Sequence, residues 1–115
     1  MSIVFTRIDD RLIHGQIVQA WLPTLNVDEV IIPVAKENAA RVNSRLLRLS
    51  LPYEYKLTVL DSHACMHYTL DHTGRLFLLM SSLQELTDLI EDGCPIKSVN
   101  IGGMHFKENA QKSIE

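Results

Sequence analysis

The sequence has no excess of positive charge. Its 115 residues include 11 Lys and Arg against 14 Asp and Glu, which gives a net charge of −3 at neutral pH. Proteins that bind nucleic acid usually carry a strong basic excess, because their affinity rests on neutralising phosphates. The composition therefore argues against a nucleic-acid partner.

Long apolar runs are also missing. No stretch approaches the roughly 20 consecutive apolar residues that a membrane-spanning helix needs. The opening residues, MSIVFTRIDD, lack the basic start, apolar block and small-residue cleavage site of a secretory signal peptide. We expect neither a transmembrane helix nor a signal peptide.

Cysteines and nucleotide-binding motifs are scarce. Cys65 and Cys94 are the only two cysteines, and we interpret them as reduced, buried thiols of a cytoplasmic protein, with a disulfide as the less favoured alternative. The sequence contains neither a G-x-G-x-x-G fingerprint nor a G-x-x-x-x-G-K-[ST] phosphate loop. We expect no bound cofactor.

What is present is an alternation of strand-like and helix-like segments. With 46% hydrophobic residues, the chain has enough apolar material for one domain over residues 1–115. Runs of β-branched, aromatic and other apolar residues predict strands at 2–8, 29–34, 55–61, 74–82 and 96–101. The second run is continuously apolar, as in a strand that is buried on both faces.

Helical spacing connects these strands. A first helix places Ile13, Ile17, Ala20 and Trp21 on one face, with Trp21 in the core, and should end near Pro23 and Asn26. A short helix is predicted over residues 62–68. Another follows the fourth strand, with Ser82 as its N-cap and Gly93 at its end.

A further helix is predicted over residues 36–50. We expect Ala39, Val42, Leu46 and Leu49 to face inward, and Arg41, Arg45 and Arg48 to face outward. The arginine stripe is interpreted as a solvated helix face in preference to a docking surface for an acidic partner.

Strands that alternate with helices form parallel βαβ units. The predicted fold is therefore α/β, an open, mainly parallel, doubly wound sheet with helices on both faces. In such sheets the functional groups lie in loops at the carboxyl ends of strands. RIDDRLIHGQ, residues 7–16, stands there after the first strand, and GGMHF, residues 102–106, stands there after the last.

The first of these loops combines groups that suit a phosphoryl group. His14 lies near the start of a helix, where free backbone N–H groups and the helix dipole favour an anion. The planar fork of Arg11 matches phosphoryl oxygens. Gly15 lets a bulky group approach the backbone, and Asp10, or less surely Asp9, would orient the imidazole by accepting its other N–H.

These groups have defined roles in phosphoryl transfer. A neutral imidazole nitrogen attacks in line, and donors spread the charge of the equatorial oxygens. His14 is the predicted nucleophile, and Arg11, Gly15 and Gln16 are the predicted phosphoryl-binding residues. No metal is required, because Arg11 and oriented amides supply a positive field. From residue types alone, a solvent-exposed loop in which Asp10 only caps the helix explains the pattern equally well.

Two other constellations are present. HACMH places His63 and His67 four residues apart, with His72 downstream, so a metal site is one interpretation, and scattered surface histidines are the favoured one. After the last strand, Asn100, Gly102 and Gly103 form a candidate second loop that either approaches a ligand closely or simply turns the chain.

The two loops together carry a resemblance to a known family. RIDDRLIHGQIVQAW, followed far downstream by SVNIGGMHF, closely resembles the IIB component of the mannose/fructose/sorbose family of the bacterial phosphoenolpyruvate-dependent sugar phosphotransferase system. The resemblance extends to about Lys107. The open, mainly parallel sheet that it implies agrees with the fold derived from the alternation of segments.

The resemblance also implies a function. His14 would accept a phosphoryl group at Nδ1 from a phosphohistidine of a IIA protein or domain, with Arg11 helping to bind it. It would then pass the group to a sugar that the IIC and IID membrane components import, at the inner face of the membrane. The sugar itself is not indicated. A regulatory IIB-like module and a small metal-binding protein are the alternatives.

One departure from the family is expected. Family members continue past the GGM turn with further strands and a helix, whereas this sequence stops at ENAQKSIE. The missing part would cover one edge of the sheet. We expect either a shortened chain or a homodimer that covers this edge.

Overall fold

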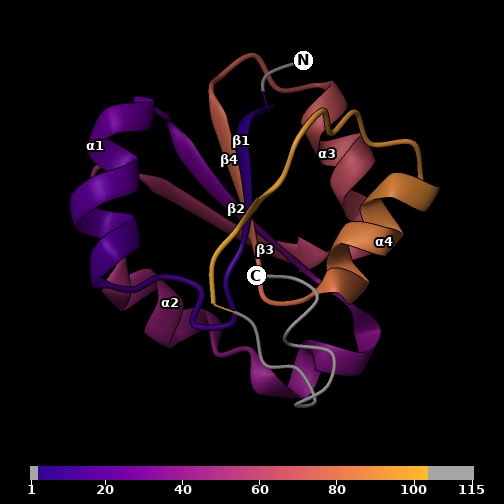
Figure 1. Cartoon of the computed structure of the whole chain (residues 1–115), viewed down its shortest axis with the longest axis horizontal. Coiled ribbons are helices and arrows are strands. Elements are labelled where there is room, and N and C mark those ends of the chain that lie inside the picture. The colour runs from indigo at the N-terminus through magenta and orange to yellow at the C-terminus, as the bar shows by residue number, and fades with distance from the viewer. Residues whose placement is uncertain (1–2, 104–115) are drawn as a thin grey trace.

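The computed structural model describes residues 3–103 (Figure 1). Its five strands are β1 (Ile3–Ile8), β2 (Glu29–Val34), β3 (Lys56–Asp61), β4 (Leu76–Met80) and β5 (Asn100–Ile101). They form one sheet in the order β3-β2-β4-β1-β5, and each pairing is parallel. The predicted open parallel sheet is confirmed.

The central strands are apolar because both of their faces are covered. Every residue of β2 and of β4 is buried. Alternate residues of β4 point into two separate apolar clusters, with Phe77 on one side of the sheet and Leu78 on the other. Helices α1 and α2 cover the first face, and α3 and α4 cover the second (Figure 1).

The first helix runs over residues 15–25 and changes its pitch along the way. It begins as an α-turn, widens into the π-helical segment η1 (Ile17–Trp21) and ends as α1 (Leu22–Leu25). Asn26 ends it in the left-handed conformation, with φ 54°. The predicted end at Asn26 is confirmed, whereas Pro23 lies inside the helix. Trp21 is partly buried and stacks on Phe5, with 4.8 Å between ring centroids.

The prediction of one helix over residues 36–50 is wrong. The segment is divided into the 3₁₀ helix η2 (Lys36–Arg41) and the helix α2 (Ser44–Ser50). Asn43 is extended between them, and its side chain accepts from the backbone N–H of Leu46 at 3.1 Å. This N-cap starts a separate helix, whose buried face differs from the one that the continuous pattern predicts. Leu47 is buried in consequence, whereas Leu46 and Leu49, predicted to face inward, are 60% and 77% exposed.

The arginine stripe is also divided. Arg41 and Arg45 are exposed. Arg48 instead donates to three backbone carbonyls of the turn that follows, those of Leu51, Pro52 and Tyr55. It therefore fastens α2 to the start of β3 and is not part of a solvated face.

The remaining helices follow the sequence closely. The predicted short helix consists of η3 (Ser62–Ala64) and α3 (Cys65–Leu70). Helix α4 (Leu83–Glu91) is capped by the Ser82 side chain, which accepts from the N–H of Gln84, and Gly93 follows it with φ 83°. Cys65 and Cys94 are both buried and free, as predicted. Within residues 3–103, no helix is long and apolar enough to cross a membrane.

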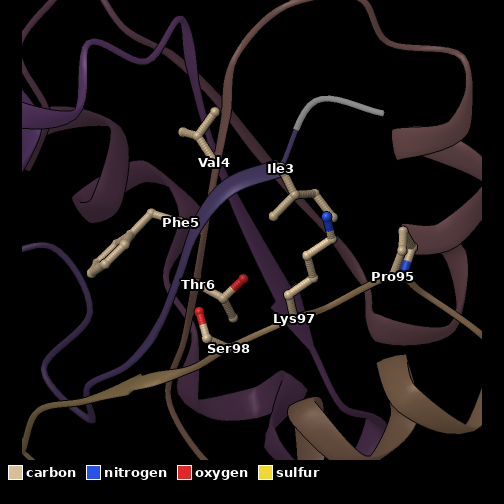
Figure 2. Close-up of a pocket in the computed structure, with 7 residues that line it drawn as sticks. All are labelled: Ile3, Val4, Phe5, Thr6, Pro95, Lys97 and Ser98. Atoms are coloured by element: carbon tan, nitrogen blue, oxygen red, sulfur yellow. The ribbon is translucent and has the colours of Figure 1, made fainter.

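The last strand is shorter than the predicted range 96–101. Only Asn100 and Ile101 pair with β1, opposite Arg7 and Ile8. Residues 95–98 run beside the first half of β1 without pairing to it, and a hollow of about 360 Å³ lies between them (Figure 2). The hollow is therefore at the amino-terminal half of β1, away from the loop that contains His14.

Candidate functional site

The His14 loop lies at a switch point of the sheet. After β1 the chain crosses to β2 on one side, and after β4 it crosses to β5 on the other. Such opposite exits open a crevice outside the carboxyl ends of the two strands. Backbone bonds hold the loop there: Asp9 N–H donates to Met80 O at 2.9 Å, and Asp10 N–H donates to Gly103 O at 2.7 Å.

Asp9 is the centre of the site. Its side chain is fully buried, and its Oδ2 lies 2.8 Å from Nε2 of His14. Its Oδ1 accepts from the backbone N–H of Arg11 at 3.1 Å. The chain turns sharply in this loop, where Leu12 has φ 55°, a conformation that L-residues rarely adopt. The turn brings His14 back over the carboxylate.

The ring-orienting acid is a correction to the sequence analysis, which placed Asp10 before Asp9. The carboxylate that contacts the His14 ring is that of Asp9, whose Oδ2 lies 2.8 Å from Nε2. Asp10 instead lines a hollow of about 270 Å³ whose wall also includes Arg41, Ser81 and Ser82.

Two arginines share the Asp9 carboxylate. Arg11 reaches it through Nε at 3.3 Å from Oδ1 and through Nη2 at 3.4 Å from Oδ2. Arg7 donates from Nη2 to Oδ2 at 3.2 Å. The two differ in exposure, because the Arg11 side chain is 56% exposed and that of Arg7 is 7% exposed.

These contacts determine the charge of Asp9. Burial raises the pKa of a carboxyl group, but the hydrogen bonds from His14 and Arg11 outweigh it and lower the pKa of Asp9 to about 2. Asp9 is therefore a carboxylate at neutral pH. As an acceptor at Nε2, it selects the neutral tautomer of His14 that carries its proton on Nε2 and leaves a lone pair on Nδ1.

The predicted phosphoryl-binding residues lie at the start of the first helix. Gly15 and Gln16 are exposed, and a β-carbon built at Gly15 would meet nothing within 4 Å. The His14 side chain is 15% exposed beside them. The geometry thus leaves open space next to the ring, where backbone N–H groups of the first helical turn can receive an anion.

The candidate second loop adjoins the same site. Asn100 Oδ1 accepts from Nη1 of Arg7. A β-carbon on Gly102 would collide with Arg7 and come within 2.7 Å of Asp9 Oδ2, and one on Gly103 would lie 3.2 Å from Asp10 Oδ1. Close approach to the buried charges explains the two glycines. The loop after β5 therefore lies directly against the side chains of the loop after β1.

Sequence reasoning missed one residue of the site. Arg7 is the first residue of RIDDRLIHGQ, and the residue types of that loop predict no role for it. The available signal was its spacing: Arg7 and Asp9 are two residues apart at the end of a strand, so their side chains point to the same face.

His63 and His72, two of the histidines outside the loop, have partners elsewhere in the fold. His63 is exposed, with Nδ1 2.6 Å from Asp92 and Nε2 3.5 Å from Asp88, and the hydrogen bond with Asp92 raises the pKa of His63. His67 is also exposed, and His72 bonds through Nδ1 to the carbonyl of Tyr68 at 3.0 Å. In the part of the chain that the structure describes, no three His, Cys, Asp or Glu side chains are placed to hold a metal ion.

Comparisons with known proteins identify the family of this chain. Residues 3–114 match the family model of the sorbose-subfamily IIB component of the phosphotransferase system. The chain is 32% identical over 111 residues to a sorbose-specific EIIB component of Lacticaseibacillus casei, covering 94% of this chain and 68% of that protein. It is 36% identical over 118 residues to a fructose-specific EIIB component of Bacillus subtilis, covering 99% and 71%.

Solved structures show the same fold. The crystal structure of the IIBSor domain of the sorbose permease from Klebsiella pneumoniae superposes with a TM-score of 0.78 at 31% identity, covering 94% of this chain and 68% of that one. A IIB component specific for N-acetylgalactosamine from Escherichia coli superposes with a TM-score of 0.81 at 25% identity, covering 93% and 72%.

Proposed function

The chain belongs to the sorbose subfamily of IIB components of the sugar phosphotransferase system, and we propose that His14 is the residue that carries the phosphoryl group. A IIB component is a phosphocarrier and sugar phosphotransferase that acts with IIA and with IIC/IID components. The observation that supports His14 is its contact of 2.8 Å with the buried Asp9 carboxylate.

The acceptor atom follows from this contact. Because Nε2 holds its proton toward Asp9, the Nδ1 lone pair of His14 attacks the phosphorus of a donor phosphohistidine in line. The N–P bond of the donor breaks, and its electron pair returns to the donor imidazole. His14 loses no proton in this step, since Nδ1 carries none. Asp9 stabilises the positive charge that develops on the ring.

The transferred group meets donors at the start of the first helix. Arg11 is exposed enough to turn its guanidinium toward the phosphoryl oxygens, and the backbone N–H groups near Gly15 and Gln16 face open space. Together they spread the negative charge of the transition state. This field comes from the protein alone, so the step requires no metal.

The finer assignment concerns donor, acceptor and location. We place the donor histidine on a IIA protein or domain and the acceptor on a hexose or hexose derivative that IIC and IID import, because sorbose-, fructose- and mannose-specific proteins all occur among the relatives. The protein would then act at the cytoplasmic face of the membrane. The proposal covers sorbose, fructose and mannose alike and selects none of them.

The test is histidine phosphorylation without a partner protein. Phosphoramidate, a small-molecule donor, should add one phosphoryl group to the wild-type protein, measured by intact mass and ³¹P NMR. His14→Ala should take up none while its circular dichroism stays unchanged, because the residue lies in a loop. His67→Ala, at an exposed histidine on α3, is the matched control and should be labelled like wild type. Undiminished labelling of His14→Ala would refute the assignment.

A further inference from the structure

We propose that Arg7 is a positioning residue for phosphoryl transfer, which holds Asp9 in place and charged while Arg11 turns to the phosphoryl group. The inference rests on the proposed role of His14. Arg7 does not reach the reacting atoms. It would act through Asp9, and it would complete the site by joining the loop after β1 to the loop after β5.

Arg7 is held almost entirely inside the protein. It is 6% exposed as a residue and lies in β1 opposite Asn100 of β5. Its Nη2 contacts Asp9, its Nη1 contacts Asn100, and its guanidinium carbon lies 5.3 Å from the ring centre of Trp21. These three partners lie around the guanidinium and hold both of its terminal nitrogens, while its buried Nε has no hydrogen-bond partner among the described residues.

The charges at Asp9 explain why a second arginine is needed. A buried carboxylate that loses its cationic partners is costly, and it tends to take up a proton. Arg11, at 56% exposure, is the arginine that can leave Asp9 for an incoming phosphoryl group. If it were the only cation, its departure would leave Asp9 and His14 alone. Arg7 stays on Oδ2, the same oxygen that contacts His14.

The second loop is built around this contact. Gly102 leaves room for Arg7 and Asp9, since any β-carbon there would meet both side chains. Gly102 N–H also donates to Ile8 O at 2.7 Å, which closes the backbone over the pair. The role of Asn100 and Gly102 is therefore to seat Arg7, with no contact to substrate required.

A double-mutant cycle separates this role from a structural one. Arg7→Gln should slow phosphorylation of His14 by phosphoramidate about tenfold, as expected for the loss of one charge-assisted hydrogen bond. In an Asp9→Asn background the same change should have an effect of less than about twofold, because the partner through which Arg7 acts is gone. Arg7→Lys should recover most of the rate, since it keeps the charge.

Arg48→Gln is the matched control. Arg48 also fastens a loop through several hydrogen bonds, but these go to backbone carbonyls of the turn that follows α2, away from Asp9 and His14. It should lower the melting temperature without changing the rate. Should Arg7→Gln fail to fold, Asn100→Ala provides the same comparison, because it removes the side chain that holds Nη1 of Arg7 and should slow phosphorylation only when Asp9 is present.

The tautomer of His14 gives a readout that a structural role would not change. In long-range ¹H–¹⁵N spectra, wild type and Arg48→Gln should show the Nε2-protonated ring, and Arg7→Gln should show a mixture of both tautomers. An unchanged tautomer and rate in folded Arg7→Gln would overturn the proposal, as would equal effects of Arg7→Gln with and without Asp9. His14→Ala in the same assay tests the proposed function separately, because only that function predicts its complete loss of labelling.

Discussion

Asp9 and Glu29 are buried carboxylates that each contact a histidine, and their other surroundings differ. Asp9 follows β1 at the carboxyl edge of the sheet, and Glu29 begins β2 at the opposite edge. Asp9 meets His14 at 2.8 Å, and Glu29 meets His72 at 3.4 Å. The remaining partners of Asp9 are two arginines.

The carboxylate of Glu29 is instead satisfied by neutral hydroxyl groups. Its Oε2 accepts from Thr58 and from Tyr68, each at 2.5 Å. The His72 ring is covered by that of Tyr68, with 4.1 Å between their centroids. His72 follows the end of α3, whereas His14 precedes the start of a helix.

A buried acid beside a histidine is therefore not sufficient for a phosphoryl site. At the Asp9 end two arginines hydrogen-bond to the carboxylate and the histidine stands next to a helix start. At the Glu29 end the hydrogen bonds come from hydroxyl groups, and a nearby cation is the exposed Lys56, whose pKa is raised by its hydrogen bond with Tyr68 and by the charge of Glu29.

The largest expected effect on the rate comes from neutralising the carboxylate of Asp9, with neutralisation of Glu29 as the comparison. Asp9→Asn should slow phosphorylation of His14 about 100-fold, or about 2.7 kcal/mol of activation free energy, because the ring loses its tautomer and its counter-charge. Glu29→Gln should leave the rate unchanged. Rates with phosphoramidate measure both, and a similar loss in Glu29→Gln would abolish the distinction between the two ends.

The contacts of Asp9 should also appear in the pH dependence of the free energy of unfolding. The pKa of Asp9 is lowered from 3.8 to about 2 on folding, so the folded state favours its charged form. That stabilisation, about 2 kcal/mol, is present above pH 4 and is lost as the pH falls toward 2. Urea unfolding across this range should show a flatter decline for Asp9→Asn than for wild type. Identical pH profiles would mean that Asp9 is not held by its partners.

A smaller effect on the rate is expected from changing Arg11, the exposed arginine that contacts Asp9. Arg11→Lys keeps the charge but loses the planar fork, so it should bind phosphoryl oxygens less specifically. We expect phosphorylation about tenfold slower, or about 1.4 kcal/mol, with the melting temperature little changed because the side chain is largely exposed. Equal rates for the two proteins would remove Arg11 from the mechanism.

The comparison also shows what sequence reasoning could reach. The alternation of apolar runs was enough for the parallel sheet, because the buried strands β2 and β4 must be apolar on both faces. The helix over residues 36–50 was misjudged because one capping side chain, Asn43, outweighed a helical pattern that continued through it. Local hydrogen bonding of this kind competes with periodicity at every Asn, Asp, Ser and Thr.

Within the site, sequence predicted the groups but not their pairing. Residue type alone was enough to identify His14, Arg11 and Gly15. An imidazole can accept a phosphoryl group, a guanidinium binds its oxygens, and a glycine allows it to approach the backbone. The choice between Asp9 and Asp10 depended on the turn at Leu12, whose positive φ has no signature in a leucine. Arg7 and Asn100 are 93 residues apart, so their contact follows only from the pairing of β1 with β5.

The π-helical segment η1 has a consequence for how this family can tolerate change in length. A π-turn contains one more residue than an α-turn, so it resembles an insertion that the helix has absorbed. Deleting one residue from Ile17–Trp21 would therefore restore an ordinary helix and leave His14 near its present orientation relative to Leu22. Deleting one residue from an ordinary helical turn would instead rotate His14 by about 100° relative to the core, because no wide turn absorbs the change. Changes of one residue in length should therefore be tolerated best within this short segment.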